Sequence, residues 1–334
     1  MNKLERRTVK VGRGFTYSYH ITPGANSAPK HAPFLFHHGW PDSHVAWSKV
    51  AEHLASLPNS LVIPDMLGYG ESEKPKDVKA LAYDGMARDM VDILDAEGID
   101  KVISVGHDHG SIPAQRLYNL HTDRVAALIL FNIPYMPPNK TGPAFSIDGF
   151  NQWATQTFGY PTYEYWNFFA LDPEAPQIMS ENVSRVWEAC HTTNMKRLFC
   201  IPGAFREYLT NHSLPSQTLK DYAYGPELKD AWIQNISAGG FEAPLNYYKA
   251  VVQDVHRESD QKVKDEDVVV QVPLLFIGGK QDPVCRPELG ESIADPGLLP
   301  NLTTVVVDTG HWPMLEKPEE VGNHVIQFLM AKGL

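Results

Sequence analysis

Cysteine, basic side chains and long apolar runs are all scarce in this sequence. The only cysteines are Cys190, Cys200 and Cys285, and because they are odd in number and far apart we expect free thiols in a cytoplasmic protein. Lys and Arg number 29 against 40 Asp and Glu, for a formal net charge of −11, which argues against nucleic acid as a partner. No run of about 18 uncharged apolar residues occurs, so we expect no membrane span.

Short apolar runs alternate along the chain with longer amphipathic segments. Runs this short and this apolar are typical of parallel strands buried on both faces, and the segments between them are typical of covering helices. We therefore predict an α/β fold with a mostly parallel central sheet and helices on both faces. The expected strands are residues 33–36, 61–63, 102–105, 126–131, 272–277 and 303–307, the expected helices are 45–55, 83–97, 112–121 and 318–331, and residues 8–11 and 15–21 are expected to form an antiparallel edge hairpin.

Residues 134–267 differ in composition from the rest of the chain. They are rich in aromatic residues and proline, as in the stretch FGYPTYEYWNFF at 158–169, and they contain no pattern typical of a buried strand. We interpret them as a helical cap inserted after the sixth strand, above the carboxyl ends of the strands, where open α/β sheets bind ligands. The predicted organisation is a core in two parts, residues 1–133 and 268–334, with the cap between them.

An apolar strand runs directly into the sequence Gly106-His-Asp-His-Gly110. This spacing matches the tight strand-to-helix turn that carries a nucleophile, with Asp108 in the place where serine is usual. The glycines allow the strained backbone that such a turn needs. The flanking His107 and His109 are too close in sequence to converge on one ion, so we expect neither a metal site nor a cofactor.

Two other predicted strands end in residues that complete a catalytic triad. Asp282 follows the strand at 272–277, and His311 follows the strand at 303–307. The chain order of nucleophile, acid and histidine is the one found with this kind of turn. We therefore expect Asp108, Asp282 and His311 to meet at one edge of the sheet.

A carboxylate nucleophile changes the chemistry expected from a triad. Asp108 is already ionised at neutral pH, so His311 is left to activate water while Asp282 stabilises the imidazolium. Attack on an sp3 carbon forms an alkyl ester of Asp108, and water then adds to the carbonyl group of that ester. The backbone N–H groups of Trp40 and His109 are expected to form the oxyanion hole for this addition.

The whole chain resembles the α/β-hydrolases, and within them it is similar to the epoxide hydrolases, which are related to the haloalkane dehalogenases. The residues that carry the resemblance are His38-Gly-Trp-Pro41, Asp65-Met-Leu-Gly-Tyr-Gly-Glu-Ser72, Gly106-His-Asp-His-Gly110, Gly239-Gly-Phe-Glu-Ala-Pro-Leu-Asn-Tyr-Tyr248 and Gly310-His-Trp312. The resemblance implies an enzyme that opens a small apolar epoxide to a vicinal diol through an ester of Asp108. It leaves the substrate skeleton open, and a homodimer is compatible with it.

The resemblance also implies that a cap tyrosine donates a hydrogen bond or its proton to the epoxide oxygen as the ring opens. This position falls on Tyr165, with Tyr163 close enough to compete. The second tyrosine of the family falls on Trp232, whose indole N–H donates a hydrogen bond but does not release its proton. We expect the substrate to contact Trp232, Trp166, Tyr163 and His38.

Two alternatives stay open on the sequence alone. Trp166 and Trp232 together resemble the halide-binding tryptophans of the dehalogenases. Against this, His109 follows the nucleophile in place of a tryptophan, and Asn132 occupies the position of an acid that some dehalogenases use. The chain is also compatible with a catalytically silent, ligand-binding member of the fold.

Overall fold

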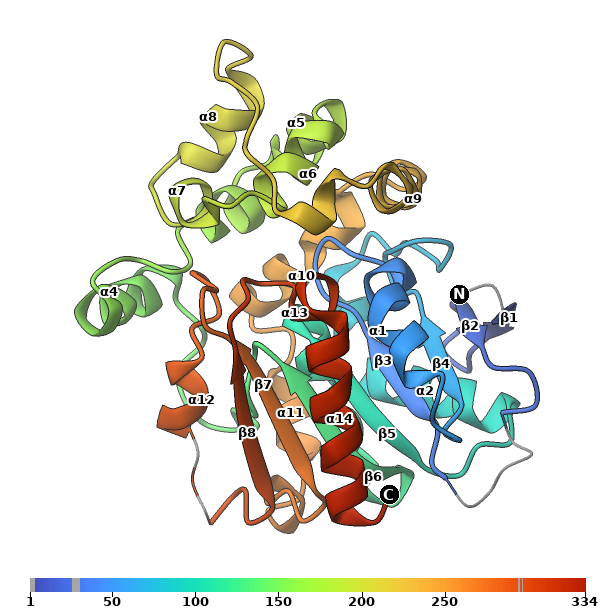
Figure 1. The fold of residues 1–334 in the computed structure, drawn as a ribbon. Coiled ribbons are helices and arrows are strands. Elements are labelled where there is room, and N and C mark those ends of the chain that lie inside the picture. The colour runs from blue at the N-terminus through green and yellow to red at the C-terminus, as the bar shows by residue number, and fades with distance from the viewer. Residues whose placement is uncertain (1–3, 26–30, 294, 296) are drawn as a thin grey trace.

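An eight-stranded β-sheet forms the centre of the molecule (Figure 1). The computed structural model describes residues 4–25, 31–293, 295 and 297–334. The strands are β1 (Glu5–Lys10), β2 (Thr16–Ile21), β3 (Phe34–His37), β4 (Leu61–Pro64), β5 (Val102–His107), β6 (Val125–Phe131), β7 (Leu274–Gly279) and β8 (Leu302–Val307). Their order in the sheet is β1-β2-β4-β3-β5-β6-β7-β8.

Most of the sheet is parallel. The hairpin of β1 and β2 is antiparallel within itself and to β4, whereas every other neighbouring pair of strands is parallel. All residues of β3, β4, β5 and β7 are buried, which explains why their sequences are apolar without alternation. The predicted α/β fold, with its mostly parallel sheet and edge hairpin, is confirmed.

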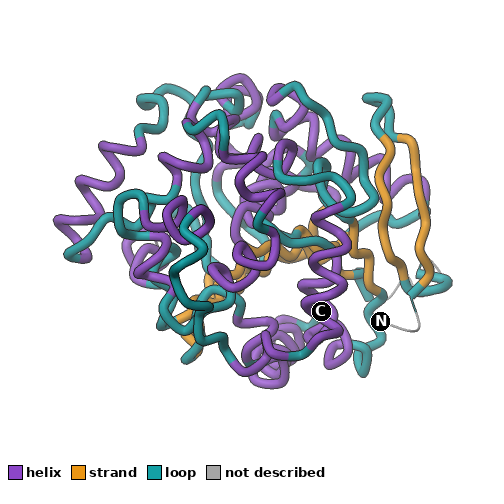
Figure 2. The backbone as a smooth tube through the Cα atoms, turned by 90° about the horizontal axis from the view of Figure 1, so that it is seen from above, coloured by secondary structure: helices purple, strands orange, loops and turns teal. Residues whose placement is uncertain are grey.

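Helices cover both faces of the sheet, as the view from above shows (Figure 2). On one face α1 (Ser48–Leu54) packs against α14 (Pro318–Lys332), and on the other α2 (Tyr83–Ala96) packs against α3 (Ser111–Leu120). Two shorter helices, α12 (Glu288–Ile293) and α13 (Pro313–Glu316), follow β7 and β8. Among the described residues, no helix is both long and apolar enough to cross a membrane.

The long connection between β6 and β7 is helical and lies largely above the sheet (Figure 1). Its helices are α4 (Ile147–Phe158), α5 (Ala175–Glu181), α6 (Val183–Cys190), α7 (Met195–Phe199), α8 (Ala204–Thr210), α9 (Pro226–Ser237), α10 (Glu242–Val252) and α11 (Arg257–Lys262). Its described residues form no strand, only one isolated bridge between Thr192 and Leu219. The last helix of the connection, α11, packs against α2 of the core. The chain has therefore reached the core again before residue 267.

Three polar contacts join the two ends of this insertion to each other and to the core. Arg116 of α3 donates from Nε to Asp260 Oδ1 of α11 at 2.7 Å. The other oxygen of Asp260 accepts a hydrogen bond from the backbone N–H of Asn139, also at 2.7 Å. Arg257, at the start of α11, donates from Nη1 to the carbonyl oxygen of Gly142 at 2.7 Å. The entry and exit segments of the insertion are therefore joined to each other and to α3.

Candidate active site

The turn after β5 holds Asp108 in a strained backbone conformation. Asp108 has a φ of 51°, in the left-handed region that favours glycine. A Cβ on Gly106 would lie 2.5 Å from Cα of Ser111, and a Cβ on Gly110 would lie 2.2 Å from the carbonyl oxygen of His37. Only glycine therefore fits at these two positions. The turn sets the Asp108 side chain just before α3, where the helix dipole favours a negative charge.

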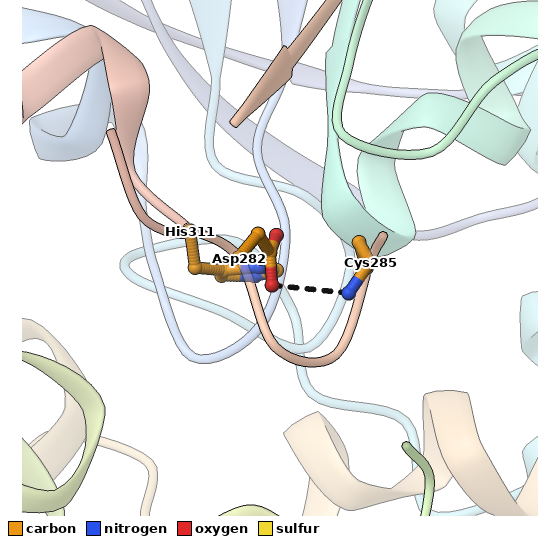
Figure 3. A group of neighbouring side chains, drawn as sticks. All are labelled: Asp282, Cys285 and His311. Atoms are coloured by element: carbon orange, nitrogen blue, oxygen red, sulfur yellow. Dashed lines mark hydrogen bonds and ion pairs between the residues drawn. The ribbon is translucent and has the colours of Figure 1, made fainter. Parts of the chain in front are cut away.

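Asp108, His311 and Asp282 meet beyond the carboxyl ends of β5, β8 and β7. His311 Nδ1 lies 2.7 Å from Asp282 Oδ2, and His311 Nε2 lies 3.5 Å from Asp108 Oδ2. All three side chains are buried, and Figure 3 shows His311 beside Asp282. The geometry brings together the three residues that the sequence singled out.

Asn132 and two backbone groups hold the acid and the histidine in place. Asn132 Nδ2 lies 2.8 Å from Asp282 Oδ2 and 2.7 Å from the carbonyl oxygen of His311. The other oxygen of Asp282 accepts hydrogen bonds from the N–H groups of Val284 and Cys285, at 2.9 and 3.0 Å. Sequence reasoning assigned Asn132 no part in the triad, although its position directly after β6, between the ends of β5 and β7, is a usable indication.

One backbone donor already contacts the nucleophile. The N–H of Trp40 donates to Asp108 Oδ1 at 3.0 Å. Gly39 permits this approach, because a Cβ there would lie 2.5 Å from Cβ of Asp108. The second expected donor, the N–H of His109, makes no hydrogen bond to Asp108 in the described part of the chain.

The charges of the triad shift two pKa values in opposite directions. Burial raises the pKa of Asp108, but the hydrogen bond from His311 and the neighbouring charges of the histidines outweigh it and hold that pKa below the ordinary 3.8. Burial lowers the pKa of His311, but the charge of Asp282 and the hydrogen bonds to both carboxylates hold it well above the ordinary 6.5. Both shifts favour the charged forms, the carboxylate of Asp108 and the imidazolium of His311.

Asp282, Cys285 and His311 offer three donor atoms within 4.8 Å of one another (Figure 3). Burial raises the pKa of the Cys285 thiol to about 12, which disfavours the thiolate that binds metals. Both oxygens of Asp282 already accept hydrogen bonds. This set of donors suits an acid and histidine pair rather than a metal ion.

A cavity of about 450 Å³, called here the apolar cavity, opens onto Asp108. Tyr165, Tyr163, Trp166 and His109 also line it, and the ring of Tyr163 stacks on that of Trp166 at a centroid distance of 5.0 Å. The remaining apolar residues of its wall are Ile112, Ile133, Pro134, Met136, Pro137, Phe145, Phe150, Trp153, Val251, Cys285 and Leu289. Burial and the charge of Asp108 raise the pKa of Tyr165 well above 10, so its phenol stays protonated and able to donate.

Trp232 and His38, two of the expected substrate contacts, do not line the apolar cavity. Trp232 lies on α9 and packs in the cap against Trp187, with ring centroids 5.4 Å apart. His38 is buried between backbone groups: its Nε2 accepts a hydrogen bond from the N–H of Met66 at 2.9 Å, and its Nδ1 lies 2.9 Å from the carbonyl oxygen of Gly39. The contacts of both residues in this structure are packing and bracing contacts within the protein.

Asp42, which the sequence did not single out, lies beside the triad. Its Oδ2 accepts a hydrogen bond from the indole N–H of Trp312 at 2.9 Å, and so supports the loop that carries His311. Burial raises the pKa of Asp42 to about 7; the hydrogen bond from Trp312 opposes this shift and the charge of Asp108 adds to it. Its place directly after the 38–41 motif is the feature that sequence reasoning passed over.

Comparison with known proteins places the fold in a family. Residues 32–318 match the α/β hydrolase fold family, and the chain therefore belongs to that family. Among solved structures, an epoxide hydrolase from Vigna radiata superposes with a TM-score of 0.79 at 24% identity, covering 99% of both chains. Epoxide hydrolase A from Mycobacterium thermoresistibile superposes with a TM-score of 0.77 at 22% identity, covering 98% of both chains. At these identities the likeness shows the fold.

Curated relatives carry related names. The chain is 26% identical to bifunctional epoxide hydrolase 2 of Rattus norvegicus over 297 residues, which cover 88% of the chain and 51% of that protein. It is 27% identical to epoxide hydrolase A of Mycobacterium tuberculosis, with 89% of the chain and 90% of that protein covered. The chain thus spans about half the length of the rat relative.

Proposed function

We propose that this chain is an epoxide hydrolase that opens an epoxide to a vicinal diol through an ester of Asp108. The observation that carries the proposal is that the ionised Asp108 carboxylate lines an apolar cavity together with the protonated phenol of Tyr165. A nucleophile and a proton donor thus share a space suited to an apolar substrate. The names of the relatives from Rattus norvegicus and Mycobacterium tuberculosis support the same activity.

The positions of the two Asp108 oxygens assign their parts in ring opening. Oδ1 is held by the N–H of Trp40, whereas Oδ2 is free of that bond and lies toward His311. Oδ2 attacks an epoxide carbon, the carbon–oxygen bond of the ring breaks, and Tyr165 donates its proton to the leaving oxygen. Oδ1 then becomes the carbonyl oxygen of the ester, already placed against the Trp40 N–H.

Ester formation prepares His311 for the second step. The carboxylate charge of Asp108 and its hydrogen bond are among the causes that raise the pKa of His311. An ester carries no charge, so alkylation lowers the pKa of His311. The imidazolium then releases its proton to solvent, the neutral imidazole acts as the base, and His311 takes a proton back from solvent once Asp108 is a carboxylate again. Asp282 keeps the imidazole oriented through Nδ1, at 2.7 Å. The neutral ring then takes a proton from the attacking water, and the Trp40 N–H stabilises the oxyanion on Oδ1.

The arrangement favours an epoxide over an alkyl halide. A leaving alkoxide needs a proton donor, which Tyr165 supplies, whereas a leaving halide needs only hydrogen-bond donors. The paired indoles expected for a halide are not both available, since Trp166 lines the apolar cavity and Trp232 does not. Product analysis distinguishes the two cases: diol without free halide is expected.

Trapping the ester tests the proposal. His311→Gln removes the base and leaves the nucleophile, so incubation with a reactive epoxide such as styrene oxide should add the mass of the epoxide to the intact protein. Asp108→Asn should give no adduct, and His53→Gln, the same substitution at a partly exposed histidine that lines neither the apolar cavity nor the triad, should turn over as the parent does. Failure of His311→Gln to form an adduct with any of a panel of epoxides and haloalkanes contradicts the two-step scheme.

We also propose that the enzyme is cytoplasmic. The three cysteines are free and buried, which fits a cytoplasmic location and a small-molecule substrate taken from the cell interior. Cell fractionation checks the location, and light scattering of the purified protein distinguishes a monomer from a homodimer.

A further inference from the structure

We propose that His311 receives its hydrolytic water from a second cavity, so that water and epoxide reach the triad from different sides. This inference rests on the proposed function. The second cavity, called here the polar cavity, has a volume of about 450 Å³ and lies among the ends of α4 and α6 and the loops after β7 and β8. His311 lines the polar cavity and Asp108 lines the apolar one; within the described residues, neither side chain lines both.

The polar cavity leads from the surface to the base. Thr157 and Asn194 lie at exposed positions on its rim, whereas Cys190 and Trp312 are almost fully buried at its inner end. Trp312 follows His311 in the chain, so the buried end of the cavity coincides with the loop that carries the base. A single water needs only roughly 10–15 Å³ of such space, so the cavity has room for a connected file of waters.

The walls of the polar cavity suit water better than an apolar skeleton. Thr192, Asn194, Lys196 and Gln281 line it, and an apolar group placed there would strip them of hydrogen-bonding partners at a cost in free energy. Thr192 and Gln281 already donate to Thr218 and Asp308, and water can bond to the polar atoms that the protein leaves unpaired. Water that enters here does not have to pass the substrate that fills the apolar cavity.

The cations of the polar cavity are largely neutralised, which argues against an anionic ligand. Lys220 pairs with Glu316 at 2.5 Å, and Arg286 pairs with Glu288. The ammonium of Lys196 lies over the Tyr160 ring, 3.5 Å from its centroid. These partners leave no cluster of unpaired positive charge for a carboxylate or phosphate to bind.

The balanced step shows what must pass through the polar cavity. The oxygen of one water bonds to Cγ of Asp108, and His311 Nε2 takes one of its protons. The bond between Cγ and Oδ2 then breaks, and His311 returns that proton to Oδ2, which leaves as one hydroxyl of the diol while the oxygen of the water replaces it in the Asp108 carboxyl group. The second proton of the water is released when Asp108 ionises again, and it replaces the one that Tyr165 gave to the epoxide. Each turnover thus consumes one water.

A label attached after folding tests the route without risk to the fold. Thr157 and Thr210 are both exposed, each near the end of a helix, and each hydroxyl donates to the carbonyl oxygen four residues earlier, at 2.9 and 3.0 Å. Only Thr157 lines the polar cavity. Thr157→Cys and Thr210→Cys, each reacted with N-phenylmaleimide, therefore form a matched pair. The native cysteines are buried and burial raises the pKa of each, so the introduced thiol reacts first.

The two chemical steps are then measured separately, by rapid quench and intact mass, with styrene oxide. Labelled Thr157→Cys should hydrolyse its ester about tenfold more slowly, with ester formation changed less than about twofold, so that the ester becomes the main species at steady state. Labelled Thr210→Cys should behave as the parent. Cys190→Leu, which adds bulk at the inner end of the polar cavity, should likewise slow ester hydrolysis and leave ester formation nearly unchanged.

Each contrary result has a distinct meaning. Slower ester formation with unchanged hydrolysis in labelled Thr157→Cys would show that the polar cavity admits substrate, and would overturn the inference. Unchanged hydrolysis in both labelled Thr157→Cys and Cys190→Leu would also overturn it. If no variant, including His311→Gln, ever forms an ester, the proposed function fails instead.

Discussion

We expect the phenol of Tyr165 to affect ring opening far more than ester hydrolysis. In Tyr165→Phe the packing of the apolar cavity is kept and the proton donor is lost, so ester formation from an epoxide should slow by about 100-fold, within the range of general acid catalysis. Tyr163→Phe changes the same cavity in the same way and should cost less than about threefold. Single-turnover kinetics in a His311→Gln background measures both. A larger loss in Tyr163→Phe would move the role of donor to that residue.

Asp42 adds a pH dependence to stability. Its pKa of about 7 in the folded protein exceeds the ordinary 3.8, so the folded state holds this proton more tightly and loses stability as pH rises from about 4 to about 7. Asp42→Asn keeps an acceptor for Trp312 and has no charge. The variant should therefore gain stability relative to the parent across this window, by up to about 1.4 kcal/mol per pH unit.

Urea unfolding of the parent and Asp42→Asn at a series of pH values measures this difference. The reference is Asp123→Asn, an exposed aspartate outside the site, which should give a flat difference. A difference between Asp42→Asn and the parent that does not change with pH would show that Asp42 keeps an ordinary pKa in the folded state.

At the scale of elements, the turn after β5 depends on close approach of two backbones. Gly110→Ala would set Cβ 2.2 Å from the carbonyl oxygen of His37, an atom that moves only with β3. We expect a loss of unfolding free energy of about 1–3 kcal/mol or more, typical of overpacking, together with loss of activity. Gly225→Ala is the matched control, because Gly225 has an ordinary φ of −67° and its nearest contact is at 3.9 Å. It should change stability by less than about 1 kcal/mol.

The strands were predictable because buried parallel strands leave a pattern in the chain itself. The run at 102–105 and the Gly-x-Asp-x-Gly turn that follows are local features, and they located β5 and Asp108. The cap was harder to predict. Counting along the chain assigned Trp232 to a substrate position, whereas in the fold Trp232 packs against Trp187, and no local pattern encodes that packing. The packing of α11 against α2 is another contact between distant segments that no local pattern encodes.

At the scale of the whole molecule, the triad was predictable and its supports were not. Chain order and strand ends were enough for Asp108, Asp282 and His311, since parallel strands bring their carboxyl ends to one edge. Asn132 contacts Asp282 across 150 positions, and Asp42 contacts Trp312 across 270. Contacts at such separations leave no periodic pattern in the sequence.

The buried histidines of the core should make the stability of the whole molecule decrease in acid. Burial lowers the pKa of His37 and His38 to about 4 and that of His107 to about 3, from the ordinary 6.5. Between a pH of about 6.5 and about 4 the unfolded chain therefore binds more protons than the folded protein does. The free energy of unfolding should fall as pH decreases through this window. Each histidine contributes a slope of up to about 1.4 kcal/mol per pH unit in this window.

Denaturant titrations at pH 7.5 and 4.5 measure the acid sensitivity. His38→Gln keeps one acceptor and one donor for the partners of His38 but does not titrate, so this variant should lose less stability between the two pH values than the parent does. The exposed change His212→Gln should follow the parent. Equal losses in parent and His38→Gln would contradict a lowered pKa for His38.

The contacts of Asp260 also limit where caps can be exchanged between relatives. Asp260 pairs with Arg116 of the core and accepts a hydrogen bond from the backbone of Asn139 on the entry side. A transplanted segment that included Asp260 would remove the buried partner of Arg116, and one that included Asn139 would replace the donor of that hydrogen bond. Chimeric enzymes should take their crossover points inside residues 143–252, and leave α11 with the recipient. Such an exchange replaces the cap side of the apolar cavity, from Phe145 to Val251, and leaves its core side and the anchoring contacts of Asp260 intact.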